Sequence, residues 1–545
     1  MRKQMKWSLL LAILFFFQTN WAQSEAFEEL KSLEILDQIY ENLDLYFVDE
    51  IQHGKLSKIA IDAMLNELDP YTVYYHEANI EDYKLMTTGQ YGGVGALIGT
   101  INGFAYITDP YEGNPAQKAG LKAGDKILTI DKRDMQGKSM EAVSDAMKGP
   151  KGTAVNIEIE RQGTRLSFNV TRDEIKIPDV PYAGMLKDKI GYIALSSFTQ
   201  TASEEIKKNL LELQGKGMEG LILDLRGNGG GLLIEAVKIV NFFVPKGQVV
   251  VSTKGRAKQE NMVYTTLSDP LAEKLPLVVL VDEGSASASE IVAGSLQDLD
   301  RAVVIGATSY GKGLVQRTFD LKYGSKIKLT IAKYYTPSGR CVQRLEYYDN
   351  VNENHSKEIP DSLLQKFKTK NGREVIDGRG IEPDVKIEDS LFSDITRALL
   401  TQNKIFLYAN DYVAKNETLS SPESYVFTEK DMKDFIGFLE KSNFMYESTS
   451  EKYMSKLKAE LEQKNQFAKV EPAFLELQKK LKIPFQDFIL AHTEEIGNLM
   501  ENEIIGRYYY QKGKNIHAFR KDPVTKSAID LLQNLEQYKK TLNIK

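Results

Sequence analysis

The 545-residue sequence predicts a multidomain α+β protein, because it is too long for one compact domain and changes pattern several times. Between residues 176 and 390, short apolar runs alternate with helical patterns, which is typical of an α/β core. A glycine-rich segment with several short strand-like runs precedes this core over residues 86–175. Helical patterns lie before and after these two parts, over residues 23–85 and 391–545.

The first 22 residues have the pattern of a secretion signal. Arg2, Lys3 and Lys6 precede the apolar run WSLLLAILFFF (7–17), which is too short to span a membrane comfortably. We expect cleavage after Ala22; the alternative is a membrane anchor that is not cleaved. The pattern favours export, to the periplasm or cell envelope if the source is a bacterium.

The two helical regions carry no motif of their own. In FEELKSLEILDQIYENL (27–43), apolar residues recur at three- and four-residue steps. Segments such as AIDLLQNLEQYKKTL (528–542) are amphipathic, and we expect residues 391–545 to form a solvated helical domain. If the protein forms a homo-oligomer, these helical regions are where we expect the contacts.

Charge and cysteine content exclude some classes of protein. The formal net charge of −6 argues against a general nucleic-acid binder, and it becomes −9 when the first 22 residues are removed. The single cysteine, Cys341, makes no internal disulfide. No histidine lies beside it, so we interpret it as a small residue rather than a nucleophile.

Residues 86–175 predict a small β-rich domain. The glycine cluster TGQYGGVGALIG is followed by the strand-like runs FAYITD, KILTID and AVNIEIER, with turn residues between them. SMEAVSDAMKG reads as a single short helix. About 90 residues are an ordinary size for such a domain.

Residues 176–390 predict an α/β core. KIGYIAL, GLILDL and LPLVVLVD read as strands, and each is followed by a helical pattern before AVVIG adds a further strand. Runs such as LILDL are apolar throughout, which suits burial on both faces of a sheet.

Three serines alternate with alanines in SASAS (285–289), between a predicted strand and a predicted helix. Ser287 and Glu290 fit a helix capping box, and for this segment alone a cap is the better interpretation. A catalytic role is compatible with a cap. A serine at the start of a helix lies where backbone N–H groups and the helix dipole stabilise an oxyanion.

A nucleophilic serine needs a group that accepts its proton. Histidines are present only outside the α/β segments that carry the motifs: His53, His76, His355, His492 and His517. Lys312 is the nearer candidate, between two glycines in YGKGLVQ, although most loop lysines are simply solvated. Gln316, four residues further on, lies on the same side as Lys312 in either a helix or a strand.

Two further features lie near the serine run. LDLRGNGGG (223–231) ends a predicted strand in a turn that presents backbone N–H groups to an anion, and it lacks the spacing of a phosphate-binding P-loop. Asp298 lies eleven residues after Ser287. The two residues would face the same side of an ideal helix but would lie roughly 16 Å apart along it. This separation is too great for a direct catalytic triad, so we expect a supporting or structural role for Asp298.

Together these segments resemble the C-terminal processing peptidases, also called tail-specific proteases, over residues 60–385. MLNELDPYTVY is similar to the helical lead-in of that family. The PDZ domain of that family is similar to three segments of this chain, GGVGALIG, NPAQKAGLKAGDKILTIDKRDM and KGPKGTAVNIEIER. Its protease core, which has a crotonase-like α/β fold, is resembled by IGYIALSSF, LDLRGNGGGLL, SASASEIVAGSLQDLDRAVVIGATSYGKGLVQ, YYTPSGR and GIEPDV.

The resemblance implies a serine endopeptidase in which Ser287 is the nucleophile. Lys312, twenty-five residues further on, would be the general base, and Gln316 would orient it. A lysine base must be neutral, and a solvated lysine has a pKa near ~10.4, so the site is expected to lower that pKa. The resemblance implies no metal and no cofactor.

The oxyanion hole implied by the resemblance uses backbone N–H groups. One belongs to Ala288 and the other to Gly230 or Gly231. The turn of this chain departs from the family pattern, because Gly227 and Gly229 stand where the family has asparagine and proline.

The PDZ resemblance implies that protein or peptide substrates are recognised by free, apolar C-termini. The loop YGGVG would hold the terminal carboxylate on backbone N–H groups, and ALIG would pair with the peptide by β-augmentation. The residues concerned are Tyr91, Gly92, Gly93, Val94, Gly95, Ala96, Leu97 and Ile98.

Two other functions remain as alternatives. The first is a PDZ scaffold with an inactive protease core, against which the intact Ser287, Lys312 and Gln316 argue. The second is a crotonase-type acyl-CoA enzyme. Export and the PDZ segment argue against it, since acyl-CoA is not expected outside the cytoplasm.

Overall fold

The computed structural model describes residues 26–76, 84–85, 87–347, 356–387, 392–519 and 521–544. The predicted secretion signal and its cleavage point after Ala22 lie outside the described residues. The chain divides into two compact units, Met1–Tyr74 and Tyr75–Lys545. Within the described part, each helix is too short or too polar to cross a membrane.

The first unit is helical where it is described, as its sequence pattern predicts. Residues 26–46 form one helix, and α2 (His53–Asn66) forms a second. The strand β1 (Val73–Tyr75) follows, and the boundary between the two units falls within it.

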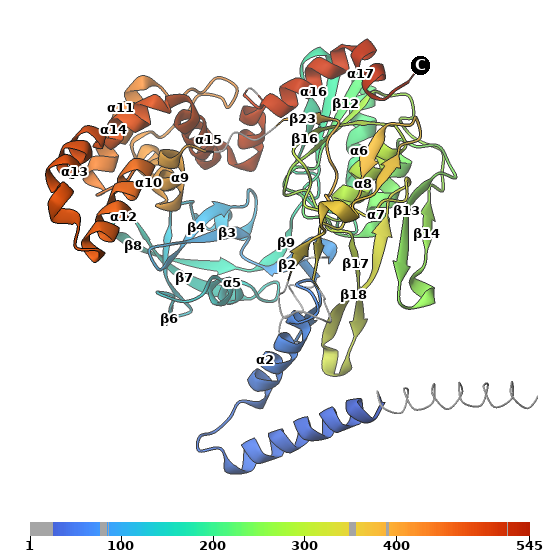
Figure 1. The fold of residues 1–545 in the computed structure, drawn as a ribbon, viewed down its shortest axis with the longest axis horizontal. Coiled ribbons are helices and arrows are strands. Elements are labelled where there is room, and N and C mark those ends of the chain that lie inside the picture. Colours follow the sequence, from blue (N-terminus) through green and yellow to red (C-terminus); the bar gives the residue numbers. More distant parts are fainter. Residues whose placement is uncertain are drawn as a thin grey trace, which may run out of the picture. The chain divides into compact units, whose positions relative to one another are not determined.

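The second unit begins with a small β domain, as predicted. Its elements are β2 (Gln90–Gly93), β3 (Ala96–Ile101), β4 (Phe104–Pro110), α4 (Pro115–Lys118), β5 (Lys126–Ile130), β6 (Arg133–Asp134), α5 (Met140–Met147), β7 (Ala154–Arg161), β8 (Thr164–Thr171) and β9 (Asp173–Lys176). The main sheet has the order β3-β4-β5-β7-β8, so β3 is an edge strand. Ribbons of this domain are cyan to teal in Figure 1.

The α/β core is built on a six-stranded sheet of order β10-β11-β12-β15-β16-β23. Its strands are β10 (Tyr182–Met185), β11 (Ile190–Ala194), β12 (Gly220–Asp224), β15 (Leu277–Val281), β16 (Val303–Gly306) and β23 (Val385–Lys386). All neighbours pair in parallel except β10 and β11. The connecting helices are α6 (Ala202–Gly215), α7 (Leu233–Asn241) and α8 (Ala288–Asp298).

Further strands form the remaining sheets of the core. β18 (Lys326–Tyr335) pairs with both β13 (Val249–Gly255) and β17 (Leu314–Asp320), and β13 also pairs with β14 (Val263–Thr265). Two short ribbons complete the core: β19 (Leu345–Glu346) with β20 (Lys357–Glu358), and β21 (Lys366–Lys368) with β22 (Glu374–Ile376).

The C-terminal region is helical, as predicted. It consists of α9 (Asp394–Thr401), α10 (Lys404–Lys415), α11 (Glu429–Lys441), α12 (Thr449–Gln463), α13 (Phe467–Leu481), α14 (Phe485–Ala491), α15 (Thr493–Ala518), α16 (Pro523–Gln533) and α17 (Leu535–Thr541). Several of these helices share a separate apolar core that includes Leu399, Phe435 and Ile504. Most of this region is therefore a domain with its own interior.

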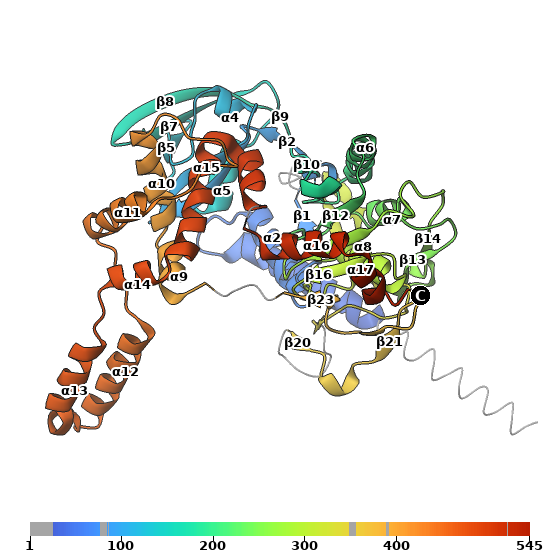
Figure 2. The ribbon, with the colours of Figure 1, turned by 90° about the horizontal axis from the view of Figure 1, so that it is seen from above.

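The last two helices differ from the solvated domain that we expected. Because side chains alternate along a strand, Leu221 and Leu223 of β12 face α6, α7 and α8, whereas Ile222 faces the other side of the sheet. There it joins a cluster with Leu532 of α16 and Tyr538 of α17. The apolar stripe of these amphipathic helices thus covers the second face of the core sheet, and α16 lies across the strands in Figure 2.

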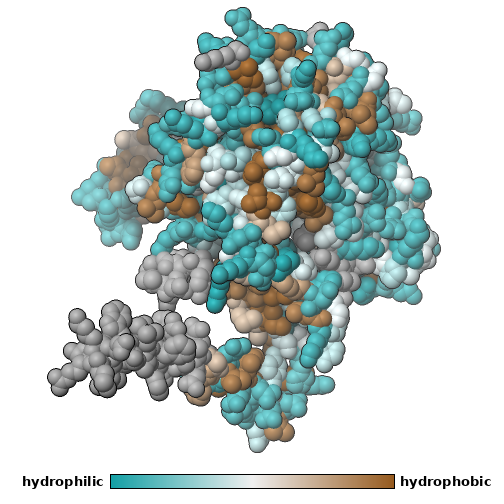
Figure 3. Space-filling model, turned by 90° about the vertical axis from the view of Figure 1, so that its right-hand side faces the viewer, coloured by the Kyte–Doolittle hydropathy of each residue, from teal (hydrophilic) through white to brown (hydrophobic). Residues whose placement is uncertain are grey.

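On the face shown in Figure 3, most side chains are hydrophilic and the hydrophobic ones form separate groups.

Candidate active site

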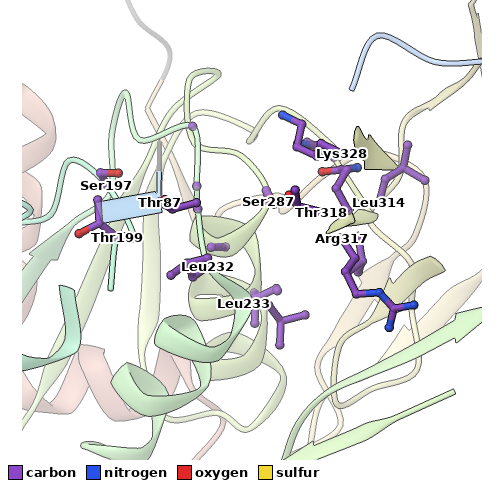
Figure 4. Close-up of a pocket in the computed structure, with 18 of the residues that line it drawn as sticks. Thr87, Ser197, Thr199, Leu232, Leu233, Ser287, Leu314, Arg317, Thr318 and Lys328 are labelled. Atoms are coloured by element: carbon purple, nitrogen blue, oxygen red, sulfur yellow. The ribbon is translucent and has the colours of Figure 1, made fainter. Parts of the chain in front are cut away.

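The glycine turn and the serine run follow neighbouring strands of the core sheet. β12 and β15 pair in parallel, so their carboxyl ends lie at the same edge, where open α/β sheets bind ligands. A cleft of about 810 Å³ opens at this edge, and its lining includes Ser287, Ala288, Lys312, Gln316 and residues 229–233. Figure 4 shows Ser287 between Leu314, Arg317 and Thr318 on one side and Ser197 and Thr199 on the other.

The structure distinguishes the three serines of the SASAS run. Ser285 and Ser289 are both 0% exposed. Their hydroxyls donate to backbone carbonyls of the glycine turn, Ser285 Oγ to Leu225 O at 2.8 Å and Ser289 Oγ to Asn228 O at 2.9 Å. Ser287 is partly exposed and lines the cleft. Among these three hydroxyls, only that of Ser287 is placed to meet a substrate.

The backbone of Ser287 is strained. Its φ of 56° and ψ of −111° are unusual for a residue with a side chain, and such strain costs of order 1–3 kcal/mol. A strained turn between a strand and a helix is also where the nucleophilic serine of α/β-hydrolases is exposed. Tyr334 Oη donates to Ser287 O at 3.2 Å. Burial raises the pKa of Tyr334, so its phenol stays neutral and remains a donor.

Glu290 connects the serine run to the loop that carries Lys312. As the capping box predicts, its carboxylate returns to the N–H of Ser287, at 2.8 Å from Oε2. Oε2 also accepts the N–H of Lys312 at 2.8 Å. Oε1 accepts the Ser309 hydroxyl at 2.6 Å and the Gly311 N–H at 2.7 Å. One buried side chain therefore fixes the backbones of Ser287 and Lys312 against each other.

Two opposing effects act on the Glu290 carboxyl. Its burial raises the pKa, and the hydrogen bonds from Ser309, Lys312, Ser287 and Gly311 lower it, with burial the larger effect. All four neighbours are donors, so the arrangement requires the ionised form as a four-fold acceptor. Protonation of Glu290 at acidic pH would place a proton against one of these donors.

We predict that Glu290→Gln sharply reduces activity. A glutamine has one acceptor oxygen, so in either orientation its NH2 group faces two of the four donors, and a buried unsatisfied group costs about 1–3 kcal/mol. We expect kcat to fall by about a hundredfold or more and the melting temperature to decrease. Glu283→Gln is the matched control, because Glu283 is exposed in the loop that precedes α8. Equal kcat values for Glu290→Gln and wild type would contradict this role.

Asn228 holds the glycine turn beside the serine run. Its Nδ2 donates to Leu195 O at 2.7 Å, and its Oδ1 accepts the N–H of Gly230 at 2.9 Å. Its carbonyl oxygen also accepts the Ala286 N–H at 3.0 Å. A Cβ at Gly230 would lie 2.8 Å from Ser287 Cβ and 3.0 Å from Ala288 N. Position 230 therefore requires glycine, because a Cβ there would lie too close to the serine run and because its φ is +99°.

The predicted oxyanion donors differ in their existing partners. The N–H of Gly230 is already used by Asn228. By contrast, within the described part of the chain, the N–H groups of Ala288 and Gly231 have no hydrogen-bond acceptor. Both residues line the cleft. Ala288 and Gly231 are therefore the available pair of donors.

The other predicted catalytic residues lie as follows. Lys312 is half-buried and lines the cleft with Ser287. Gln316 lies in β17, opposite Thr330 of β18, and its Nε2 donates to Thr330 Oγ1 at 3.2 Å. Asp298 is at the far end of α8 from Ser287, in a buried ion pair with Arg340 at 2.9 Å.

The residues predicted to bind a peptide tail lie around a groove of the small β domain. Tyr91, Gly92 and Gly93 belong to β2, Val94 and Gly95 follow it, and Ala96, Leu97 and Ile98 begin β3. A groove of about 370 Å³ is lined by Tyr91, Val94, Ala96, Leu97 and Ile98, with Met140, Ser144 and Met147 of α5. The three glycines are not in its lining; Gly92 instead allows a close approach, since a Cβ there would lie 2.3 Å from Gly149 O.

Sequence reasoning missed three residues of the catalytic region. Glu290 was predicted only as a helix cap, and no role was predicted for Asn228 or Tyr334. Asn228 carried a detectable signal, as one of two residues other than glycine in RGNGGG. Tyr334 lies in YYTPSGR, which carried the family resemblance but indicated no role for this side chain. Among the described residues, no cluster of three or more His, Cys, Asp or Glu side chains is arranged to hold a metal ion.

Comparison with known families assigns a class to each part of the chain. Residues 189–352 match peptidase family S41, and residues 106–161 match the PDZ domain. Residues 395–532 match a family described as "Probable PDZ-protease, C-terminal helical domain". The matches define a serine peptidase with a PDZ domain and a C-terminal helical domain.

Comparison with characterised proteins specifies the family. The chain is 36% identical over 329 residues to the carboxy-terminal processing protease CtpB of Bacillus subtilis, covering 59% of this chain and 68% of that protein. It is 37% identical over 319 residues to a carboxy-terminal-processing protease of Bartonella bacilliformis, covering 57% of this chain and 73% of that protein. The chain therefore belongs to the carboxy-terminal processing proteases of peptidase family S41.

The chain also resembles solved structures, but it superposes on them with low TM-scores. The photosystem II D1 C-terminal processing protease is 27% identical with a TM-score of 0.36, covering 64% of this chain and 85% of that one. A putative S41 protease from Bacteroides fragilis is 14% identical with a TM-score of 0.39. The match covers 68% of this chain and 93% of that one.

Proposed function

We propose that this S41 peptidase cleaves peptide bonds with Ser287 as its nucleophile and Lys312 as its general base. The contrast among the three serines carries the proposal: Ser285 and Ser289 are fully buried and bonded to carbonyls, and Ser287 lines the cleft. Lys312 lines the same cleft, and its backbone is bound to the carboxylate that also binds Ser287 N–H. Release of peptides from a denatured protein by wild type, and not by Ser287→Ala, tests it.

The reaction follows from these roles. Ser287 Oγ attacks the substrate carbonyl carbon, and its proton passes to the neutral amine of Lys312. The N–H groups of Ala288 and Gly231 stabilise the oxyanion. The carbon–nitrogen bond breaks as Lys312 returns the proton to the leaving amine, and an acyl-enzyme remains. Water then attacks the ester, giving its proton to Lys312 and finally to Ser287 Oγ, which releases the carboxylic acid product.

Gln316 is proposed to orient Lys312 through a neutral amide. A carboxylate at this position would stabilise the protonated amine and so oppose its action as a base. Thr330 supports this role, because its hydroxyl accepts from Gln316 Nε2 and fixes the rotamer of the side chain.

The PDZ domain is proposed to bind the C-terminal tail of a substrate in the groove between β3 and α5. The outer edge of β3 has no strand partner among the described residues, which suits pairing with an extended peptide. Val94, Ile98 and Met147 make the groove apolar, so we expect an apolar last residue. The preceding loop supplies backbone N–H groups for the terminal carboxylate.

We predict that amidation of the C-terminus sharply reduces cleavage of a long peptide substrate. An amide removes the negative charge that backbone N–H groups bind, so KM is expected to rise about tenfold or more. Two otherwise identical peptides, free and amidated, are compared by their kcat/KM values.

A matched pair of variants assigns the effect to the groove. Ser144→Trp fills it, whereas Ala142→Trp adds the same bulk at an exposed position of α5 outside its lining. Only Ser144→Trp should remove the difference between the free and the amidated peptide. If wild type cleaves both peptides equally well, this PDZ domain does not recognise a free tail.

We also propose that the protein is exported. The basic start, the apolar run of residues 7–17 and the small residue Ala22 support this proposal. N-terminal sequencing of the protein from a cell-envelope fraction is expected to begin at Gln23; a chain recovered only in the cytoplasm would contradict export.

A further inference from the structure

The glycine turn beside Ser287 has few side chains with which to hold its position. In RGNGGG (226–231), Arg226 and Asn228 are the two residues that are not glycine. Glycine-rich backbone has the largest conformational freedom, so these two side chains add to the contacts that neighbouring segments make with the turn, such as the bond from Gly227 N–H to Asp282 Oδ1 at 2.8 Å. Asn228 is fixed from within the core, by Leu195 and the serine run.

Arg226 is fixed partly from the opposite end of the chain. Its guanidinium donates to both carboxylate oxygens of Asp224, at 2.6 to 3.0 Å. Nη2 also donates to Asp522 Oδ2 at 2.7 Å and lies 3.4 Å from Thr525 Oγ1. Asp522 is 296 residues further along the sequence and belongs to the C-terminal helical region.

The Arg226–Asp522 contact is enclosed and charged. The side chains of Arg226 and Asp522 are 24% and 15% exposed. Burial alone would lower the pKa of Arg226, but the carboxylates of Asp224 and Asp522 raise it overall. Burial alone would raise the pKa of Asp522, but Arg226 lowers it overall. Both groups are therefore ionised in the neutral pH range, where charge-assisted bonds are strong.

Asp522 is itself held by the core sheet. It is the N-cap of α16, where its carboxylate accepts the N–H of Val524 at 3.0 Å. Val524, Ala528 and Leu532 of this helix pack on the sheet in the cluster that includes Ile222 of β12. The carboxylate that holds Arg226 thus stands on a helix anchored to the strand that leads into the glycine turn.

We infer that Arg226 and Asp522 are positioning residues that set the glycine turn for catalysis, so that the C-terminal helix α16 completes the active site. The inference rests on the proposed role of Gly231 as an oxyanion donor. The turn packs so closely against the serine run that a Cβ on Gly230 would lie 2.8 Å from Ser287 Cβ, so we expect a small displacement of Arg226 to alter the donor geometry. Misplacement by about 1 Å costs up to a hundredfold in rate.

The test separates this role from the structural role of Asp522 as a helix cap. Asp522→Ser keeps a good N-cap and removes the carboxylate, and Asp224 still pairs with Arg226, so the variant is expected to fold. Asp522→Glu keeps the charge. Asp530→Ala is the control, because Asp530 is an exposed aspartate of the same helix. A fluorophosphonate probe titrates the fraction of competent Ser287 in each preparation, and kcat and KM are measured per competent site.

We expect Asp522→Ser and Arg226→Gln each to lower kcat about tenfold or more with KM changed less than about twofold, because the oxyanion is stabilised only in the transition state. The double variant should be no slower than the slower of the two single variants, since both break the link between Arg226 and Asp522. Asp522→Glu should recover part of the loss, and Asp530→Ala should match wild type.

Two results would overturn the inference while leaving the proposed function standing: wild-type kcat per competent site in Asp522→Ser, or losses that multiply in the double variant. An inactive wild-type enzyme, or an active Ser287→Ala variant, would overturn the proposed function and the inference with it.

Discussion

Replacing Ser287 by alanine is expected to abolish proteolysis while the fold survives. The substitution removes the oxygen that we propose forms the acyl-enzyme, and loss of such a nucleophile lowers kcat by at least about a thousandfold. Ser287 is partly exposed, so alanine leaves no buried cavity, and loss of the capping hydroxyl at the start of α8 is expected to lower stability by only about 1 kcal/mol. Peptide release from a denatured protein, followed by mass spectrometry, measures the loss.

The two neighbouring serines are the controls for Ser287. Ser285→Ala and Ser289→Ala each remove a buried hydrogen bond to a carbonyl of the glycine turn, which costs about 1 kcal/mol. They should lower the melting temperature and keep activity within about tenfold of wild type. An active Ser287→Ala variant beside an inactive Ser285→Ala or Ser289→Ala variant would refute the assignment.

Lys312→Arg is expected to be as inactive as Lys312→Ala. Arginine keeps the positive charge and a long side chain, but its guanidinium stays protonated in proteins and cannot accept the proton of Ser287. The loss in kcat should again be at least about a thousandfold. The comparison of the two variants shows whether the site needs a base or only a cation.

The pH dependence of the wild-type rate provides an independent check on the base. Activity should rise with pH as Lys312 loses its proton. Gln316→Glu should move that rise to higher pH, because a nearby negative charge favours the protonated amine. Substantial turnover by Lys312→Arg would mean that another group, such as a histidine, accepts the proton.

Local patterns in the sequence predicted much of the catalytic core. The alternation of apolar strands and helical segments gave the α/β sheet, and LILDL is buried on both faces as its composition indicates. The capping-box spacing predicted that the Glu290 carboxylate returns to Ser287 N–H. These features depend on residues close together in sequence, so their signal is local.

Contacts between distant segments were not predictable in this way. Glu290 also binds Ser309, Gly311 and Lys312, and nothing in the spacing of a capping box indicates further partners. The contact of Arg226 with Asp522 joins residues 296 positions apart. The amphipathic pattern of α16 predicts that one face is covered but does not say by what, which is why its packing on the core sheet was missed.

The central claim, that Ser287 is activated by Lys312, is tested most directly by mapping a fluorophosphonate adduct on the intact protein. The probe labels serines that are activated as nucleophiles, and peptide mass spectrometry locates the adduct. The account predicts one adduct, on Ser287, in wild type at neutral pH, and no adduct in Lys312→Arg under the same conditions. An adduct on any other serine, or labelling of Lys312→Arg at the wild-type rate, would contradict it.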